Sequence, residues 1–169
     1  NEEILTVIKG IYPVLIRIYK EYFAWENKRV DKINLLKAKS EEGFWAFLRD
    51  FEIYPGMITK TLGNSLWSQI LDPENNDIRG NLFDNDSWLK TKDAGILFKF
   101  TKFCQILVKI AFLSNKQPSQ ENKNLKKISQ VQQFISFLER LEFSRGMAKF
   151  AKQGQRFIPK QILEKVFFY

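Results

Sequence analysis

The side chains that most often carry chemistry in enzymes are scarce in this sequence. The chain of 169 residues has no histidine and a single cysteine, Cys104, which stands among apolar residues. Histidine is the commonest general base and a common metal ligand, and a thiol without an activating base is expected to be buried and inert. Nucleotide-binding glycine loops and the G-x-S-x-G nucleophile motif are also absent. We therefore expect neither enzymatic activity nor a cofactor.

Carboxylates are the remaining groups that could act in pairs or bind a metal. Glu41 and Glu42 follow Ser40, a pattern typical of a helix N-terminus, where a polar cap and acidic side chains are favourable. More acids lie in the polar stretch 72–93, where the run D-P-E-N-N-D is followed neither by a glycine at the position that a calcium loop requires nor by its terminal glutamate. We interpret 72–93 as a solvated surface loop and expect no metal site.

Residues 91–102 have the outline of a calcium-binding loop without its ligands. Phe98, Phe100 and Phe103 occupy the apolar positions of such a loop and of the helix that follows it, but Lys102 stands where a bidentate glutamate normally binds the ion. One carboxylate in the loop cannot supply the roughly six to eight oxygen ligands that calcium requires. We expect a helix–loop–helix retained for packing, with Lys102 facing solvent or a carboxylate.

Positive charge is concentrated near the end of the chain. Residues 116–169 contain 11 of the 27 lysines and arginines but 4 of the 19 acids, so they carry +7 of the net charge of +8. Basic residues with aromatic residues between them could bind an acidic protein surface. They could also bind a nucleic acid, through its phosphates and by base stacking. The third interpretation is an ordinary solvated helix face. The residues assigned to partner binding are Arg145, Lys149, Phe150, Lys152, Arg156, Phe157 and Lys160.

Apolar residues recur at helical spacing along most of the chain, without strand-like alternation, which predicts an all-α fold. We expect a short helix over 2–9 that ends at Gly10, and a second helix whose first turn contains Pro13. The charged stretch 26–39 is expected to be a loop. The next helix is then expected to begin at Ser40, its N-cap.

The clearest core stripe of the sequence follows this cap. Phe44, Phe47, Leu48 and Phe51 recur at helical spacing, and the turn Tyr54-Pro55-Gly56 should end their helix. Further helices are expected near residues 62–71 and over residues 95–113. We divide the chain into an EF-hand-like helical bundle over 1–113 with the acidic loop 72–93, a linker over 114–124, and a basic amphipathic helical extension over 125–169; the EF-hand-like part of this division rests on the resemblance given below.

The most hydrophobic segment, 95–113, contains Lys99, Lys102 and Lys109. These lysines at helical spacing form a solvated stripe, so we expect no membrane span. One cysteine cannot build a disulfide framework, which favours a reducing, cytoplasmic compartment.

Four aromatic-rich segments follow one another between Leu15 and Ala111: LIRIYKEYF, FWAFLRDFEIYPGMITK, LWSQIL and LFKFTKFCQILVKIA. The second contains the turn D-F-x-I-x-P at residues 50–55. This order resembles degenerate EF-hand-like modules of ciliary and cytoskeletal proteins, and distantly the tubulin polymerisation promoting protein family. The resemblance implies a four-helix, paired-hand fold that does not bind calcium and acts as an interaction module in a microtubule-based assembly.

The residues and the resemblance together lead to one expected function and one alternative. We expect a non-enzymatic structural or interaction subunit of a microtubule-based, ciliary axonemal assembly, located in the cytoskeleton, cilium or axoneme. Its expected partners are proteins of a large complex, tubulin or axonemal proteins among them. The alternative is a nucleic-acid-associated subunit of a ribonucleoprotein complex that uses the basic, aromatic C-terminal segment.

Overall fold

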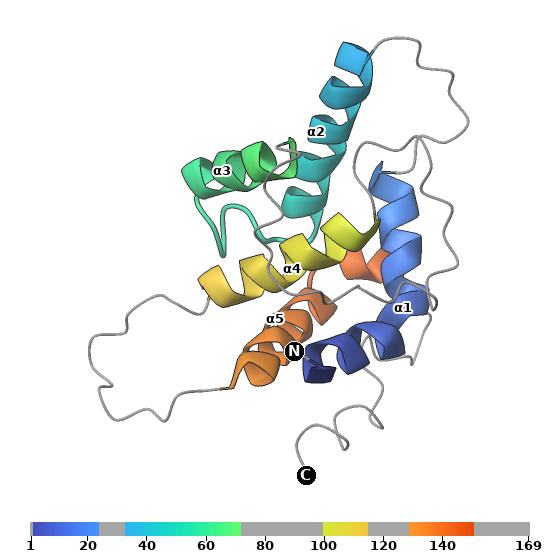
Figure 1. Cartoon of the computed structure of the whole chain (residues 1–169), viewed down its shortest axis with the longest axis vertical. Helices are drawn as coiled ribbons and strands as arrows, with labels where there is room; N and C mark the ends of the chain where they lie inside the picture. Colours follow the sequence, from blue (N-terminus) through green and yellow to red (C-terminus); the bar gives the residue numbers. More distant parts are fainter. Residues whose placement is uncertain (1, 24–32, 72–99, 115–128, 151–169) are drawn as a thin grey trace.

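The computed structural model describes residues 2–23, 33–71, 100–114 and 129–150 (Figure 1). The helices are α1 (Glu2–Phe23), α2 (Ile33–Asp50), α3 (Lys60–Leu71), α4 (Phe100–Ser114) and α5 (Gln130–Glu142), followed by the short 3-10 helix η2 (Gly146–Lys149). No β-strand occurs in these ranges, and the predicted all-α class is confirmed.

α1 is one continuous helix, although we predicted two helices separated near Gly10 and Pro13. Proline removes one hydrogen bond of a helix, and glycine lowers helix propensity. However, Ile8, Ile11 and Leu15 are all buried and carry one apolar stripe across the proline. Packing of that stripe outweighs the helix-breaking preferences of the glycine and the proline. Figure 1 shows that the helix axis changes direction between the two halves of α1.

α2 begins at Ile33, so two further predictions are wrong. Residues 33–39 are helical rather than a loop, and Ser40 lies inside the helix, 2% exposed, rather than at its N-cap. The leucines, lysines and alanine before Ser40 are good helix formers, and they extend the helix beyond the capping signal. The predicted core residues at the other end of α2 are all buried: Phe44, Phe47, Leu48 and Phe51.

The remaining predicted helices agree with the structure where it describes them. α3 starts at Lys60, close to the predicted start of 62, and α4 covers the predicted 95–113 from Phe100 onward. Residues 95–99 lie outside the described ranges. Cys104 is buried in α4, as predicted.

α2 ends in a hydrogen-bonded cap in which Glu52 takes the place usually held by glycine. Ile53 N donates to Leu48 O at 2.8 Å, and Glu52 N donates to Arg49 O at 3.1 Å. These two bonds define a Schellman motif. Glu52 has a φ of 59°, a left-handed conformation that costs a residue with a side chain roughly 1 kcal/mol. The Glu52 side chain has contacts, described below, that glycine could not make.

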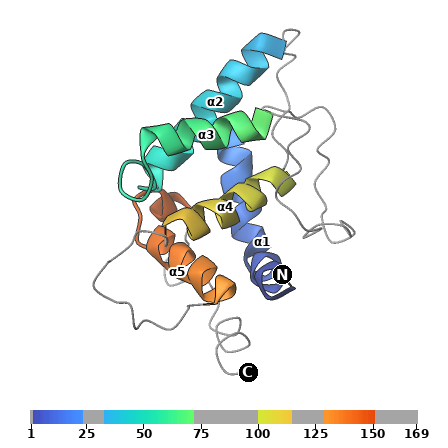
Figure 2. The same ribbon diagram turned by 60° about the vertical axis from the view of Figure 1, so that its left-hand side comes forward.

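Aromatic rings dominate the core, and α4 contributes two of them. α4 lies between α3 and α5 in both views (Figure 1, Figure 2). Phe103 lies 5.4 Å from Phe23 of α1 and 5.3 Å from Phe47 of α2, measured between ring centroids. Phe100 is also fully buried. The packing role predicted for these two phenylalanines of α4 is confirmed, and Phe98 lies outside the described residues.

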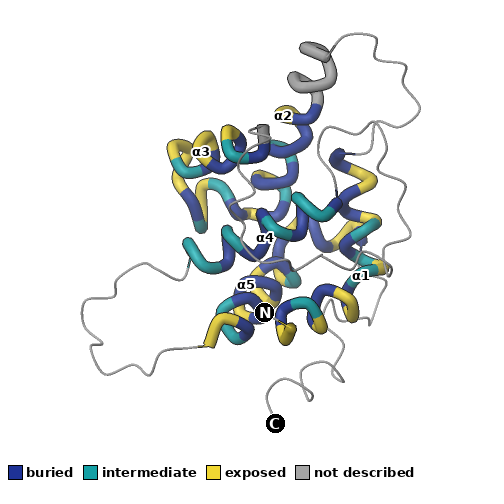
Figure 3. The backbone as a smooth tube through the Cα atoms, in the orientation of Figure 1, coloured by how far each residue is buried: buried dark blue, intermediate teal, exposed yellow. Residues whose placement is uncertain are grey.

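α5 contributes to the same core as α1, α2 and α4. It begins with a capping box, in which Gln132 N donates to Ser129 Oγ at 3.3 Å and Ser129 N donates to Gln132 Oε1 at 3.2 Å. Buried and exposed residues alternate along α1 and α5 (Figure 3). The described part of the basic extension, residues 129–150, is therefore packed onto the rest of the bundle.

Candidate interaction surface

Residues 143–150, which we call the basic turn, run from the end of α5 through η2 and pack against the C-terminal end of α2. Met147 and Phe150 anchor the turn, with 1% and 7% of their surface exposed. The ring of Phe150 stacks on Phe51 at 6.1 Å and 28°, and lies 6.3 Å from the ring of Tyr22. The turn is thus held by apolar burial as well as by polar contacts.

Gly146 allows this close packing. A Cβ atom at this position would lie 2.8 Å from Cδ2 of Phe51 and 3.0 Å from the carbonyl carbon of Asp50. Because one of these neighbours is backbone, any larger residue would push the basic turn away from α2.

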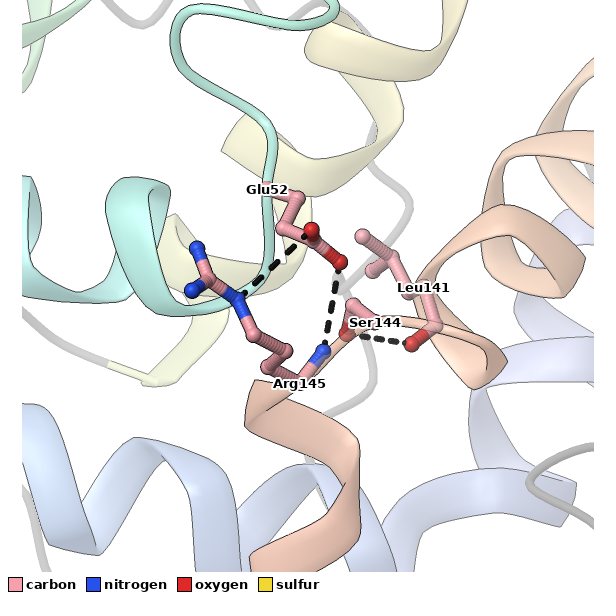
Figure 4. Close-up of polar contacts among 4 residues, drawn as sticks. All are labelled: Glu52, Leu141, Ser144 and Arg145. Atoms are coloured by element: carbon pink, nitrogen blue, oxygen red, sulfur yellow. Dashed lines mark hydrogen bonds and ion pairs between the residues drawn. The ribbon is translucent and has the colours of Figure 1, made fainter.

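Glu52 contacts the start of the basic turn (Figure 4). Arg145 N donates to Glu52 Oε2 at 3.2 Å, and Arg145 Nε lies 3.7 Å from Glu52 Oε1. Beside this pair, Ser144 Oγ donates to Leu141 O at 2.6 Å and satisfies a carbonyl at the end of α5. The Arg145 and Glu52 side chains are 84% and 48% exposed, so their ion pair contributes little to stability.

Asp50 connects the basic turn to α1. Its Oδ2 accepts a hydrogen bond from Tyr22 Oη at 2.6 Å and lies 3.7 Å from Lys149 Nζ. Burial raises the pKa of Tyr22 above its usual value, and the hydrogen bond to Asp50 and the charge of that carboxylate raise it further. Asp50 therefore joins α1, α2 and the basic turn at one oxygen.

A groove with a volume of about 440 Å³ lies between α1 and the basic turn. Arg17 and Lys20 of α1 line it together with Lys149, and Glu21 is the one acid among its lining residues. Arg17 Nη1 also donates to the main-chain oxygen of Phe150 at 3.2 Å. The positive charge of the basic turn is therefore continuous with positive charge on α1, which favours an anionic partner.

Phe143 is the residue of this surface that the sequence analysis missed. It is 87% exposed, and Arg140 and Arg145 close to it in sequence are exposed as well. The buried stripe of α5 passes through Leu138 and Leu141, and Phe143 falls outside that helical period. This mismatch in spacing was visible in the sequence and is the signal that could have identified Phe143.

The structure accounts for some of the residues assigned to partner binding. Arg145 and Lys149 are exposed, at 84% and 64% of their side chains, although each is also near a carboxylate of the same chain. Phe150 is buried, so its ring does not belong to the exposed surface. The other assigned residues lie outside the described ranges: Lys152, Arg156, Phe157 and Lys160.

Lys102 has an acceptor that the sequence did not predict. Its Nζ donates to the main-chain oxygen of Ile70 at 2.8 Å. Ile70 lies in the last turn of α3, where carbonyl groups lack helical partners and a cation is favourable. Lys102, which stands where the sequence pattern of a calcium loop would place a glutamate, therefore joins α4 to α3.

The described residues contain no cluster of three or more histidine, cysteine or acidic side chains that could hold a metal ion. The acidic stretch 72–93 lies outside these residues. None of the helices in the described ranges has both the length and the apolar character needed to cross a membrane.

Comparisons with known proteins give no relative from which a function could be transferred. No protein-family model, no curated protein and no solved structure matches this chain.

Proposed function

We propose that this chain is a non-enzymatic, EF-hand-like interaction subunit of a microtubule-based assembly such as the ciliary axoneme, and that the basic turn binds an acidic protein surface there. The observation that carries this contact is the exposed ring of Phe143, which lies in the sequence between the exposed residues Arg140 and Arg145. The microtubule assignment is supported by the resemblance of the aromatic segments. Calcium regulation is not part of the proposal, because Lys102 stands in place of the usual ligand.

The composition of the surface supports a protein partner. Aromatic residues and arginine are enriched at the centres of protein interfaces, where they often provide most of the binding energy. Lysine and arginine around such a centre attract an acidic partner and increase the association rate. Because the Arg145–Glu52 pair is largely exposed, Arg145 can exchange Glu52 for a carboxylate of the partner at a small cost.

Packing in the first four helices supports the EF-hand-like part of the proposal. The phenylalanines expected to hold paired hands together, Phe100 and Phe103, are both buried. Lys102 binds the main chain of α3, so a cation of the protein itself joins the two helices that would flank the ion-binding loop. These contacts support a module whose helix pairing is maintained by packing.

The burial of Phe150 weighs against the nucleic-acid alternative. Base stacking requires an accessible aromatic face, and Phe150 packs against Phe51 and Tyr22 inside the protein. Phe143 is the exposed ring that remains on the described surface, and a single ring suits an apolar anchor better than a stacking platform.

Co-sedimentation of the full chain with stabilised microtubules tests this proposal. We expect the wild-type chain to pellet with microtubules and the double variant Phe143→Ala/Arg145→Gln to bind at least tenfold more weakly. Lys9→Gln, which removes one exposed positive charge from α1, is the matched control and should change the affinity less than twofold. Equal binding by the double variant, or no binding by the wild type, would contradict the proposal. Binding to a single-stranded oligouridine in place of microtubules would favour the alternative.

A further inference from the structure

A second groove, with a volume of about 500 Å³, lies between α2 and α3. Two aromatic and four charged residues line most of it: Glu41, Glu42, Trp45, Arg49, Tyr54 and Lys60. All four charged residues are exposed, and both aromatic residues are half-buried. The groove therefore combines an apolar floor with a charged rim.

The floor is formed by a well-defined aromatic pair. Trp45 and Tyr54 meet edge to face, with ring centroids 5.4 Å apart and an interplanar angle of 80°. A Cβ atom on Gly63 of α3 would lie 2.6 Å from Cη2 of Trp45, so the indole rests directly against the backbone of α3. The two rings offer a rigid apolar surface, and their faces also attract cations.

The charges of the rim are separated along α2. Glu41, Trp45 and Arg49 are spaced four residues apart, so they share one face of the helix. Glu41 and Arg49 are eight positions apart and therefore lie roughly 12 Å apart along the helix axis. Lys60, the first residue of α3, adds a second cation to the groove. The groove thus has an acidic end on α2, an aromatic middle and a cation about two turns further along.

The charged side chains of this rim have no partners within the described ranges. None of Glu41, Glu42, Arg49 and Lys60 forms an ion pair or a side-chain hydrogen bond with a residue that the structure describes. Arg145 and Lys149, by contrast, each lie near a carboxylate of the same chain. Among the described residues, a partner that binds in the groove would therefore displace no ion pair.

We propose that this groove binds an extended segment of a partner protein, whose basic side chain contacts Glu41 and Glu42 and whose acidic side chain contacts Arg49 and Lys60. An apolar side chain between them packs on the Trp45–Tyr54 pair. A distance of roughly 12 Å corresponds to about three or four residues of extended chain, so the segment carries its two charges at that separation. This site is independent of the basic turn and of the microtubule proposal.

Titration of the full chain with three capped hexapeptides tests this site. The probes are Gly-Arg-Ser-Leu-Glu-Gly, the reversed order Gly-Glu-Leu-Ser-Arg-Gly, and the neutral Gly-Gln-Ser-Leu-Gln-Gly. Binding is followed by the NMR signal of the Trp45 indole N–H, which is assigned with the Trp45→Phe variant. We expect at least one charged peptide to shift this signal with a Kd at least tenfold lower than that of the neutral peptide.

Two pairs of substitutions provide the matched comparison. Glu41→Gln/Glu42→Gln should reduce the preference for the charged peptide to less than threefold. Glu2→Gln/Glu3→Gln makes the same change of charge at the start of α1 and should leave the Kd within twofold of wild type. The proposal is wrong if no peptide shifts the signal, if the neutral peptide binds equally well, or if both variant pairs weaken binding alike.

Discussion

Two groups of charged residues flank α2, one where the helix meets the basic turn and one where it faces α3. At the basic turn, Asp50 and Glu52 each lie near a cation that is 93 or more residues away in the sequence. In the groove, the acids and cations have no such contacts within the described residues. A partner of the basic turn would therefore exchange an exposed internal ion pair for a new one, whereas a partner of the groove would displace no ion pair among the described residues.

The aromatic residues of the two regions also differ in burial: Phe150 of the basic turn is buried, and Trp45 and Tyr54 of the groove are half-buried. Phe150 of the basic turn is buried between Phe51 and Tyr22, and Gly146 brings the backbone of the turn against α2. Trp45 and Tyr54 of the groove remain half-buried. The basic turn is therefore a fixed part of the fold that presents Phe143 outward, while the groove is an open surface on a fixed support.

The largest effect on stability should come from Phe150, and Phe143 in the same basic turn provides the matched control. Phe150→Ala should lower the free energy of unfolding by about 3 kcal/mol, because it removes a buried ring. Phe143→Ala, the same substitution at an exposed site, should change it by less than about 0.5 kcal/mol. Urea denaturation followed by circular dichroism measures both values. Similar losses for the two variants would mean that the basic turn is not anchored as described.

An intermediate effect is expected at Tyr22. Tyr22→Phe should cost about 1 kcal/mol, because Asp50 loses a hydrogen bond. The folded state holds the tyrosine proton more tightly than the unfolded chain does, so this stabilisation is complete below the unfolded pKa of about 10 and is lost as the pH rises above it. Denaturation midpoints between pH 8 and pH 11 should fall more steeply for wild type than for Tyr22→Phe. Parallel curves would exclude this role for Tyr22.

The smallest effect concerns the exposed ion pairs, and it compares the two charged regions directly. A double-mutant cycle with Arg145→Gln and Glu52→Gln should give a coupling energy of about 0.5 kcal/mol, since the pair is exposed. The cycle with Arg49→Gln and Glu41→Gln in the groove should give a coupling near zero. If the groove pair showed the larger coupling, the contrast between paired and unpaired charges would be wrong.

Much of the fold could be predicted from the sequence, because the apolar stripes have helical spacing. Phe44, Phe47 and Leu48 are buried in α2, as their period indicated. Helix boundaries were less predictable. Pro13 and Ser40 have clear local preferences, but packing of the neighbouring stripes and the helix formers before Ser40 prevailed over them.

The candidate surfaces could be predicted in part. The exposure of Arg145 and Lys149 followed from their charge, but their proximity to Glu52 and Asp50 depends on how the basic turn folds back onto α2. No local pattern reports such a long-range contact. The groove has the same difficulty, because Tyr54 meets Trp45 through the path of the turn after α2.

Two lysines of α4 reach the same end of α3. Lys102 Nζ donates to Ile70 O, and Lys109 Nζ donates to Gln69 Oε1. These lysines are seven residues apart, or roughly 10 Å along α4. Their acceptors, Ile70 and Gln69, are adjacent in sequence, so two hydrogen bonds from separate turns of α4 converge on the last turn of α3. The C-terminal end of α3 is therefore attached to two turns of α4 at once, and loss of either lysine would leave the other hydrogen bond in place.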